Sequence, residues 1–119
     1  MGCNQTSEWV SGNVLIRPMY LHKAGDEIQG HSHNFDHTSI VFSGAVRIEA
    51  TAPDGREFAR EFKSPRPDWG GPSHALIKAE VVHKLIATED NTIVWCTYAH
   101  RTPQGEVVQQ YNGWSDAYS

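Results

Sequence analysis

The sequence lacks any apolar run near the ~20 residues that a membrane-spanning helix needs, and its start has no apolar segment typical of a secretory signal. Cysteine is scarce: only Cys3 and Cys96 are present, so no disulfide framework is indicated. Basic residues are outnumbered, and the net charge of -4 argues against nucleic acid or an anionic membrane as a partner. We therefore expect a cytoplasmic protein in reducing surroundings.

A long 3.6-residue period of apolar side chains is also missing, so little helix is expected. Hydrophobic residues make up 39% of the chain and charged residues 20%, which is typical of a globular protein rather than a disordered one. The length of 119 residues fits one compact domain. We predict a single domain over residues 1–119, with a core over 14–98 and both ends packed on it.

What the sequence does contain is a series of short apolar segments separated by turn signals. The turns are Ser43-Gly44, Pro53-Asp54-Gly55 and Glu89-Asp90-Asn91, and residues 64–73 form a loop by composition. This spacing predicts an all-β fold of two packed antiparallel sheets, a jelly-roll type of barrel. Pro18 indicates an edge or a bulge in the first long strand. The predicted strands cover residues 14–21, 38–42, 45–51, 56–62, 75–79, 83–88 and 92–98.

Three of the seven histidines, His31, His33 and His37, lie within seven residues of one another. On a strand, residues two apart point to the same side, about 6.5 Å apart along the chain. Imidazoles at that spacing can converge on one ion at the ~2.0–2.1 Å of a metal–nitrogen bond. His37 has the same parity and can complete the group after a bend near Phe35. The cluster therefore predicts a metal site, whereas a lone His-x-His pair would be interpreted as surface histidines.

Around these histidines the sequence resembles the cupin superfamily. The first cupin motif is Gly, five residues, His-x-His, three or four residues, Glu, six residues, Gly. In this chain Gly25 opens the pattern, His31 and His33 form the His-x-His pair, His37 takes the Glu position, and Gly44 closes it. The resemblance implies a cupin-type double-stranded β-helix over roughly residues 14–98.

A second cupin motif supplies a further histidine on a later strand, and it is degenerate here. His83 is its best match, while Lys78, Glu80 and Ala87 replace the proline, glycine and asparagine of the pattern. His74 competes for this place because it follows Gly70-Gly71-Pro72. We favour His83, which shares a strand face with Leu85 and Ala87. The resemblance thus implies a metal held by His31, His33, His37 and His83.

The histidine at position 37 changes the expected chemistry of the site. Most enzymatic cupins resemble a three-His, one-Glu site, so histidine removes one negative charge from the ligands. Four neutral imidazoles leave a divalent ion its full charge, which makes it a stronger Lewis acid. Imidazole favours transition metals, and we expect zinc, iron or nickel rather than magnesium or calcium.

The function expected from these features is that of a metal-dependent enzyme acting on a small anionic or enolisable molecule, by oxygenase, isomerase, cyclase or lyase chemistry. The alternative is a non-catalytic module that binds or senses a small molecule, or a structural role in which the metal staples the fold. No catalytic base is assigned from the sequence. Tyr20, Tyr98 and Glu27 could reach the barrel mouth. Asp36, opposite in parity to the histidines, is expected to point away from the metal or to support its ligands. Cys96 is expected to be a small core residue or a thiol near the metal.

The remaining prediction concerns association. Four tryptophans in a small domain are difficult to bury within one copy, and the cupin resemblance also implies a homodimer. His22 and His100 have no partner at ligand spacing and are expected at the surface or the rim.

Overall fold

The computed structural model describes residues 4–5, 8–29 and 36–108. Within these ranges the chain forms ten strands and no helix, which confirms the all-β prediction. No helix long and apolar enough to cross a membrane exists in the described part of the chain.

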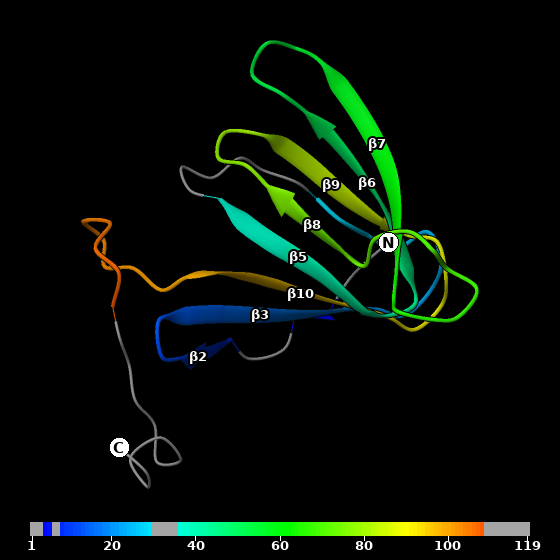
Figure 1. The fold of residues 1–119 in the computed structure, drawn as a ribbon, viewed down its shortest axis with the longest axis horizontal. Helices are drawn as coiled ribbons and strands as arrows, with labels where there is room; N and C mark the ends of the chain where they lie inside the picture. The colour runs from blue at the N-terminus through cyan, green and yellow to red at the C-terminus, as the bar shows by residue number, and fades with distance from the viewer. Residues whose placement is uncertain (1–3, 6–7, 30–35, 109–119) are drawn as a thin grey trace, which may run out of the picture.

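The strands form two antiparallel sheets, which Figure 1 shows as two groups of strands packed at an angle. The larger sheet has the order β1-β3-β10-β5-β8, with β2 paired to β3, and the smaller has the order β4-β9-β6-β7. The six strands of the larger sheet are β1 (Asn4–Gln5), β2 (Trp9–Ser11), β3 (Val14–Leu21), β5 (His37–Ser43), β8 (His74–Ile77) and β10 (Thr92–Ala99). The four of the smaller are β4 (Glu27–Ile28), β6 (Ala45–Thr51), β7 (Glu57–Lys63) and β9 (Val82–Ala87).

All seven predicted strands are present, two with the predicted bounds and five within two residues of them. The short strands β1, β2 and β4 were not predicted, because two or three residues are too few to show a period. The interpretation of Pro18 as an edge position needs correction, since β3 has neighbours on both sides. Pro18 lies between the residues that pair with β2 and those that pair with β1, where no ladder hydrogen bond from its nitrogen is needed.

The core lies between the two sheets and comes from strand alternation. Leu21, Val41 and Val94 point inward from the larger sheet, and Val46 and Leu85 from the smaller one, each at most 1% exposed. Branched aliphatic side chains favour the pleated strand backbone and pack densely here. This core fixes the parity of every strand, and therefore decides which polar side chains point into the space between the sheets.

At one end of the sandwich an arginine holds three loops together. Arg66 donates to both carboxylate oxygens of Glu89, at 2.8 and 3.1 Å, and to the backbone oxygen of Gly44 at 2.7 Å. The hydrogen bond from Arg66 holds the pKa of Glu89 below its usual value, although burial acts against it. The pair thus connects the predicted 64–73 loop to the turns at 43–44 and 89–91.

We expect Glu89→Gln to lower the melting temperature at pH 7, and the deficit to shrink as the pH falls below the unfolded pKa of Glu89. Because the folded pKa of Glu89 is depressed, its contribution is present above the unfolded value of about 4.3 and is lost as pH falls through the folded value. Thermal unfolding at pH 7 and at pH 3 measures this. Asp54→Asn is the control, since its pair with Arg56 is much more exposed and should matter little at either pH. A Glu89→Gln deficit that is as large at pH 3 as at pH 7 would contradict the assignment.

Candidate metal centre and adjoining cavity

Two buried histidines from opposite sheets face each other at the end of the sandwich away from Arg66. His37 is the first residue of β5 and is 5% exposed, and His83 is the second residue of β9 and is 7% exposed. Their ring centroids are 4.9 Å apart, with ring planes at 47°. Histidine side chains are not usually buried in contact with each other. At this separation a nitrogen atom of each ring can bind the same metal ion.

Strand register explains how the two rings meet. His37 is the cross-strand partner of Ile77 and His83 that of Ala50, so both histidines share the inward parity of the core. His83 Nδ1 lies 3.3 Å from the backbone oxygen of Val81, which can only accept a hydrogen bond. The proton of a neutral His83 ring therefore belongs on Nδ1, and its lone pair on Nε2, as metal-binding histidines commonly require.

The competing histidine, His74, lies on the other side of its sheet. It is the cross-strand partner of Ile40, which points outward, and it is exposed. His22 is also exposed, beyond the end of β3, with its ring against Tyr20. His100 is half-buried and follows β10. The structure therefore brings His37 and His83 together and leaves the other described histidines apart from them.

His31 and His33 lie outside the described residues, as does Phe35. Among the residues that are described, no group of three or more metal-ligating side chains occurs. The residues that flank the histidine segment are described, and they bracket the pair: Gln29 lines a hollow together with His83, and Asp36 directly precedes His37.

Asp36 connects the two segments that carry His37 and His83. Its Oδ1 accepts a hydrogen bond of 2.7 Å from the backbone N–H of Ala79, in the turn between β8 and β9. The bond joins the start of β5 to the turn that leads into His83, and so helps to keep the two histidines in register. Asp36 itself is exposed and points away from the rings, as its parity predicts.

A tyrosine and an arginine share the inward face beside His37. Thr97 is the partner of Thr38, so the next residue of β10, Tyr98, adjoins His37 across the strands. Arg17 of β3 donates to the hydroxyl oxygen of Tyr98 at 3.3 Å and forms an ion pair with Glu8. This contact ties the phenol of Tyr98 to β3 on the inward face of the larger sheet.

The other residues considered for acid–base catalysis do not lie beside the histidine pair. Tyr20 has the outward parity of β3, and Glu27 pairs with Lys84 at 3.8 Å on the outer side of the smaller sheet. Cys96 is half-buried, packs against the core, and has its sulfur 3.6 Å from the Ser39 hydroxyl. Arg17 was not identified from the sequence. The alternation that places Leu21 inward also places Arg17 inward, and that parity was the signal available.

An apolar cavity adjoins the histidine pair. It lies between β7 and β8, the neighbouring edges of the two sheets, and has a volume of about 300 Å³. Ala50 and Ile77, the cross-strand partners of the two histidines, line it on opposite sides. Arg60 is the only charged residue among its described lining residues, and its guanidinium lies 6.0 Å above the Phe62 ring. The cavity is open to solvent, since Phe58 and Leu76 are more than half exposed, and it can accommodate a small molecule with a negatively charged end.

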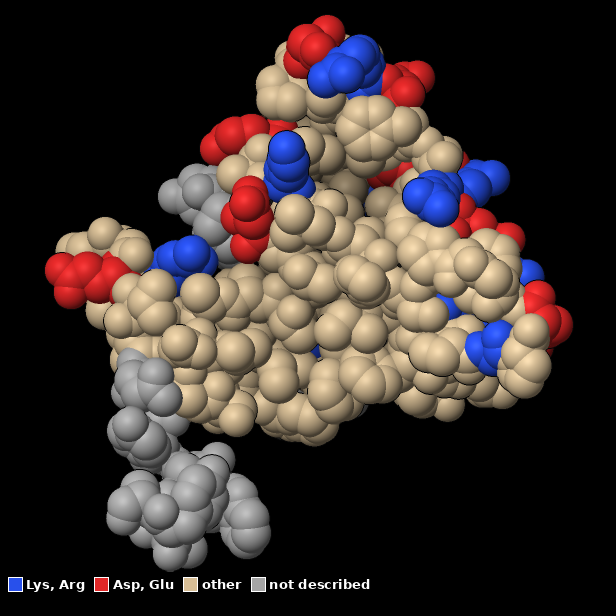
Figure 2. Space-filling model, viewed as in Figure 1, with Lys and Arg blue, Asp and Glu red and all other residues tan. Residues whose placement is uncertain are grey.

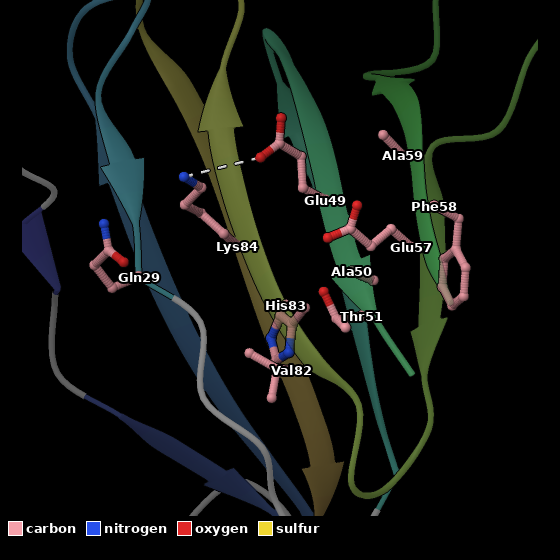
Figure 3. Close-up of a pocket in the computed structure, with 10 residues that line it drawn as sticks. All are labelled: Gln29, Glu49, Ala50, Thr51, Glu57, Phe58, Ala59, Val82, His83 and Lys84. Atoms are coloured by element: carbon pink, nitrogen blue, oxygen red, sulfur yellow. Dashed lines mark ion pairs between the residues drawn. The ribbon is translucent and has the colours of Figure 1, made fainter. Parts of the chain in front are cut away.

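A second hollow, of about 580 Å³, lies where β6 ends and β7 and β9 begin, and His83 is among its lining residues (Figure 3). Its charged groups lie on the outer side of the smaller sheet, and Lys84 forms an ion pair of 3.8 Å with Glu49. Val82 and Thr51 form its floor next to the histidine. Paired surface charges of this kind are well solvated, so we regard the hollow as an approach to His83 rather than as the binding cavity.

No protein-family model matches the sequence, and no curated protein matches it closely enough to count as a relative. Solved structures match its fold. A variant of oxalate decarboxylase from Bacillus subtilis matches over 82% of this chain and 24% of its own, with TM-score 0.62 and 14% identity. KdgF from Halomonas sp. matches over 87% of this chain and 84% of its own, with TM-score 0.63 and 15% identity. Oxalate oxidase in complex with the substrate analogue glycolate matches over 76% and 44%, with TM-score 0.63 and 10% identity.

At these identities the likeness concerns the fold alone. The fold is of the cupin type, as the motif around Gly25 and Gly44 implied. The chain spans about a quarter of the length of the oxalate decarboxylase chain, and most of the length of KdgF.

Proposed function

We propose that this protein is a metal-dependent enzyme that acts on a small anionic molecule in the cavity between its sheets. The observation that carries the proposal is the buried pair of histidines, His37 and His83, whose cross-strand partners Ile77 and Ala50 line an apolar cavity. Two facing imidazoles at the mouth of a cupin-type sandwich are suited to a divalent transition metal. Oxygenase, isomerase, cyclase and lyase chemistry are all compatible with this arrangement.

His31 and His33 complete the proposed ligand set. The segment that carries them begins after Gln29, beside His83, and ends at Asp36, beside His37, so both of its flanks lie next to the pair. The residues present fit a metal, because His83 is oriented through Nδ1 and both rings are shielded from solvent. When bound, the ion would polarise an oxygen atom of the substrate as a Lewis acid.

The protein's own side chains would bind the substrate and transfer protons. Arg60 provides a positive charge on an otherwise apolar wall, where it can pair with a carboxylate, although its own side chain is exposed. Tyr98 lies on the inward face of β10, the strand next to that of His37, and is our candidate for donating a proton to a reacting oxygen or accepting one. Phe58 and Ala50 give the cavity an apolar wall on the side of the smaller sheet.

A non-catalytic binding module is the second candidate, and the cavity favours it over a purely structural metal staple. A structural metal needs four ligands and a closed environment, whereas about 300 Å³ of apolar space next to the histidines has no structural use. Binding and catalysis share this site and differ in whether the ligand is converted.

The test is a thermal-shift titration of the metal-loaded protein with small carboxylates, glycolate among them. We expect a rise in melting temperature for the wild type, little or none for Arg60→Gln, and none for His37→Ala. Arg47→Gln is the matched control, since Arg47 lies on the outer side of the same sheet next to Glu49. Mass spectrometry of the incubated carboxylate then distinguishes conversion, expected of an enzyme, from binding alone. A protein that responds to no carboxylate would contradict the proposal.

A further inference from the structure

The turn that joins β8 to β9 carries the chain from one sheet to the other beside the histidine pair. It covers residues 78–81 and is closed by a hydrogen bond of 3.3 Å between its first and last residues. Ile77, the cross-strand partner of His37, precedes the turn, and His83 lies two residues beyond it. In Figure 1 the turn lies next to the start of β5. The shape of this turn therefore sets where His83 lies relative to His37.

Glu80 gives this turn a strained backbone. Its φ is +69°, in the left-handed region that a residue with a side chain seldom adopts. Such a conformation persists only where the surrounding structure enforces it. Asp36 Oδ1 accepts a hydrogen bond of 2.7 Å from the Ala79 N–H, and the Val81 side chain packs against the core. When the Asp36 contact is removed, the turn can relax towards an unstrained form.

The backbone of the same turn orients His83. The Val81 oxygen lies 3.3 Å from His83 Nδ1 and can only accept a proton, so it holds the ring with Nε2 as the metal-binding nitrogen. Because Val81 follows Glu80 directly, a change in the Glu80 backbone moves this oxygen. The contacts thus run from Asp36, directly before His37, through the turn to the ring of His83.

We propose that the strained turn 78–81 is a positioning device for the metal centre, in which Asp36 holds the turn in the form whose Val81 oxygen orients His83. The proposal rests on the proposed metal-dependent function. Asp36 is exposed, and charged groups of both signs lie around this end of the strands in Figure 2. A solvated hydrogen bond of this kind adds little to folding stability, so its main effect is expected on the geometry of the site.

Titration of the metal-free protein with Zn²⁺ tests the proposal. Asp36→Ala should weaken binding about tenfold or more, as the loss of a contact behind a metal ligand commonly does. Asp36→Asn keeps an oxygen that accepts the Ala79 N–H and should stay within about threefold of the wild type. Asp90→Ala is the matched control, because Asp90 Oδ1 accepts a similar bond of 2.9 Å from the Ala24 N–H at the opposite end of the sandwich. That variant should bind Zn²⁺ like the wild type.

Glycine at position 80 provides a sharper comparison. Glycine adopts a φ of +69° without strain, so the turn then depends much less on Asp36. Asp36→Ala should therefore weaken Zn²⁺ binding by only about threefold or less when Glu80→Gly is also present. An equal loss in both backgrounds overturns the proposal, because the Asp36 contact would then act independently of the strained turn.

The tautomer of His83 in the metal-free protein separates this proposal from the proposed function. Nitrogen-15 NMR, at a pH where the ring is neutral, should place the proton on Nδ1 in the wild type and in Asp36→Asn. Asp36→Ala should give a mixture of both tautomers, and an unchanged tautomer in this variant overturns the proposal. A wild type that binds no metal rejects the proposed function, while the tautomer still decides whether Asp36 and the turn orient His83.

Discussion

His37→Ala and His83→Ala should each leave the purified protein with a small fraction of the metal carried by the wild type, and should lower its melting temperature by about 10 °C or more. Ligand convergence exists only in the folded state, so the binding free energy adds to folding stability. A metal present at a thousand times its Kd contributes about 4 kcal/mol. In a domain of this size each kcal/mol corresponds to a shift of several degrees in melting temperature.

Elemental analysis of each variant, followed by thermal unfolding with and without a chelator, measures both effects. A chelator should lower the melting temperature of the wild type and have no further effect on His37→Ala. His31→Ala and His33→Ala are expected to behave like His37→Ala. His74→Ala is the control, because His74 is exposed on the opposite side of its sheet.

Two outcomes of this comparison would count against the proposed ligands. If His74→Ala empties the site while His83→Ala retains the metal, the second motif has been aligned with the wrong histidine. If the wild type and all variants carry equal metal, or none, the metal centre is rejected as a whole.

Gly44→Ala should destabilise the fold by about 3 kcal/mol or more, through two effects that act together. Gly44 has φ +75°, which L side chains seldom adopt. A Cβ there would also overlap the Thr92 hydroxyl and lie 2.8 Å from the Thr92 Cα. Thr92 is fully buried and donates its hydroxyl proton to the Glu89 backbone oxygen at 2.8 Å, so it cannot move away.

Gly55→Ala separates the two effects. Gly55 has a similar φ of +89°, but nothing lies within 4 Å of the position of its Cβ. Its substitution should therefore cost only the backbone strain of about 1–2 kcal/mol. Chemical unfolding of both variants gives the difference, which we attribute to Thr92. Equal losses at the two positions would show that the close approach to Thr92 is unimportant.

Much of the fold could be predicted because local patterns and tertiary packing agree. Residues 14–21 and 45–51 alternate or are rich in branched side chains, and turn residues border them, so their strands were placed correctly. The strands β1 and β2 escaped prediction because they are stabilised by pairing with β3 rather than by their own composition. Pairing partners distant in the chain cannot be read from a local window.

The all-β class, the turn at Gly44 and the inward parity of His37 and His83 could be predicted from local patterns, because alternation along a strand is a local property. The tertiary structure brings these two rings together, since β5 and β9 belong to different sheets that meet through the core between them. It likewise placed Arg17 against Tyr98 and opened the cavity beside Arg60. Contacts between distant strands depend on register and on sheet packing, which are set by the whole chain at once.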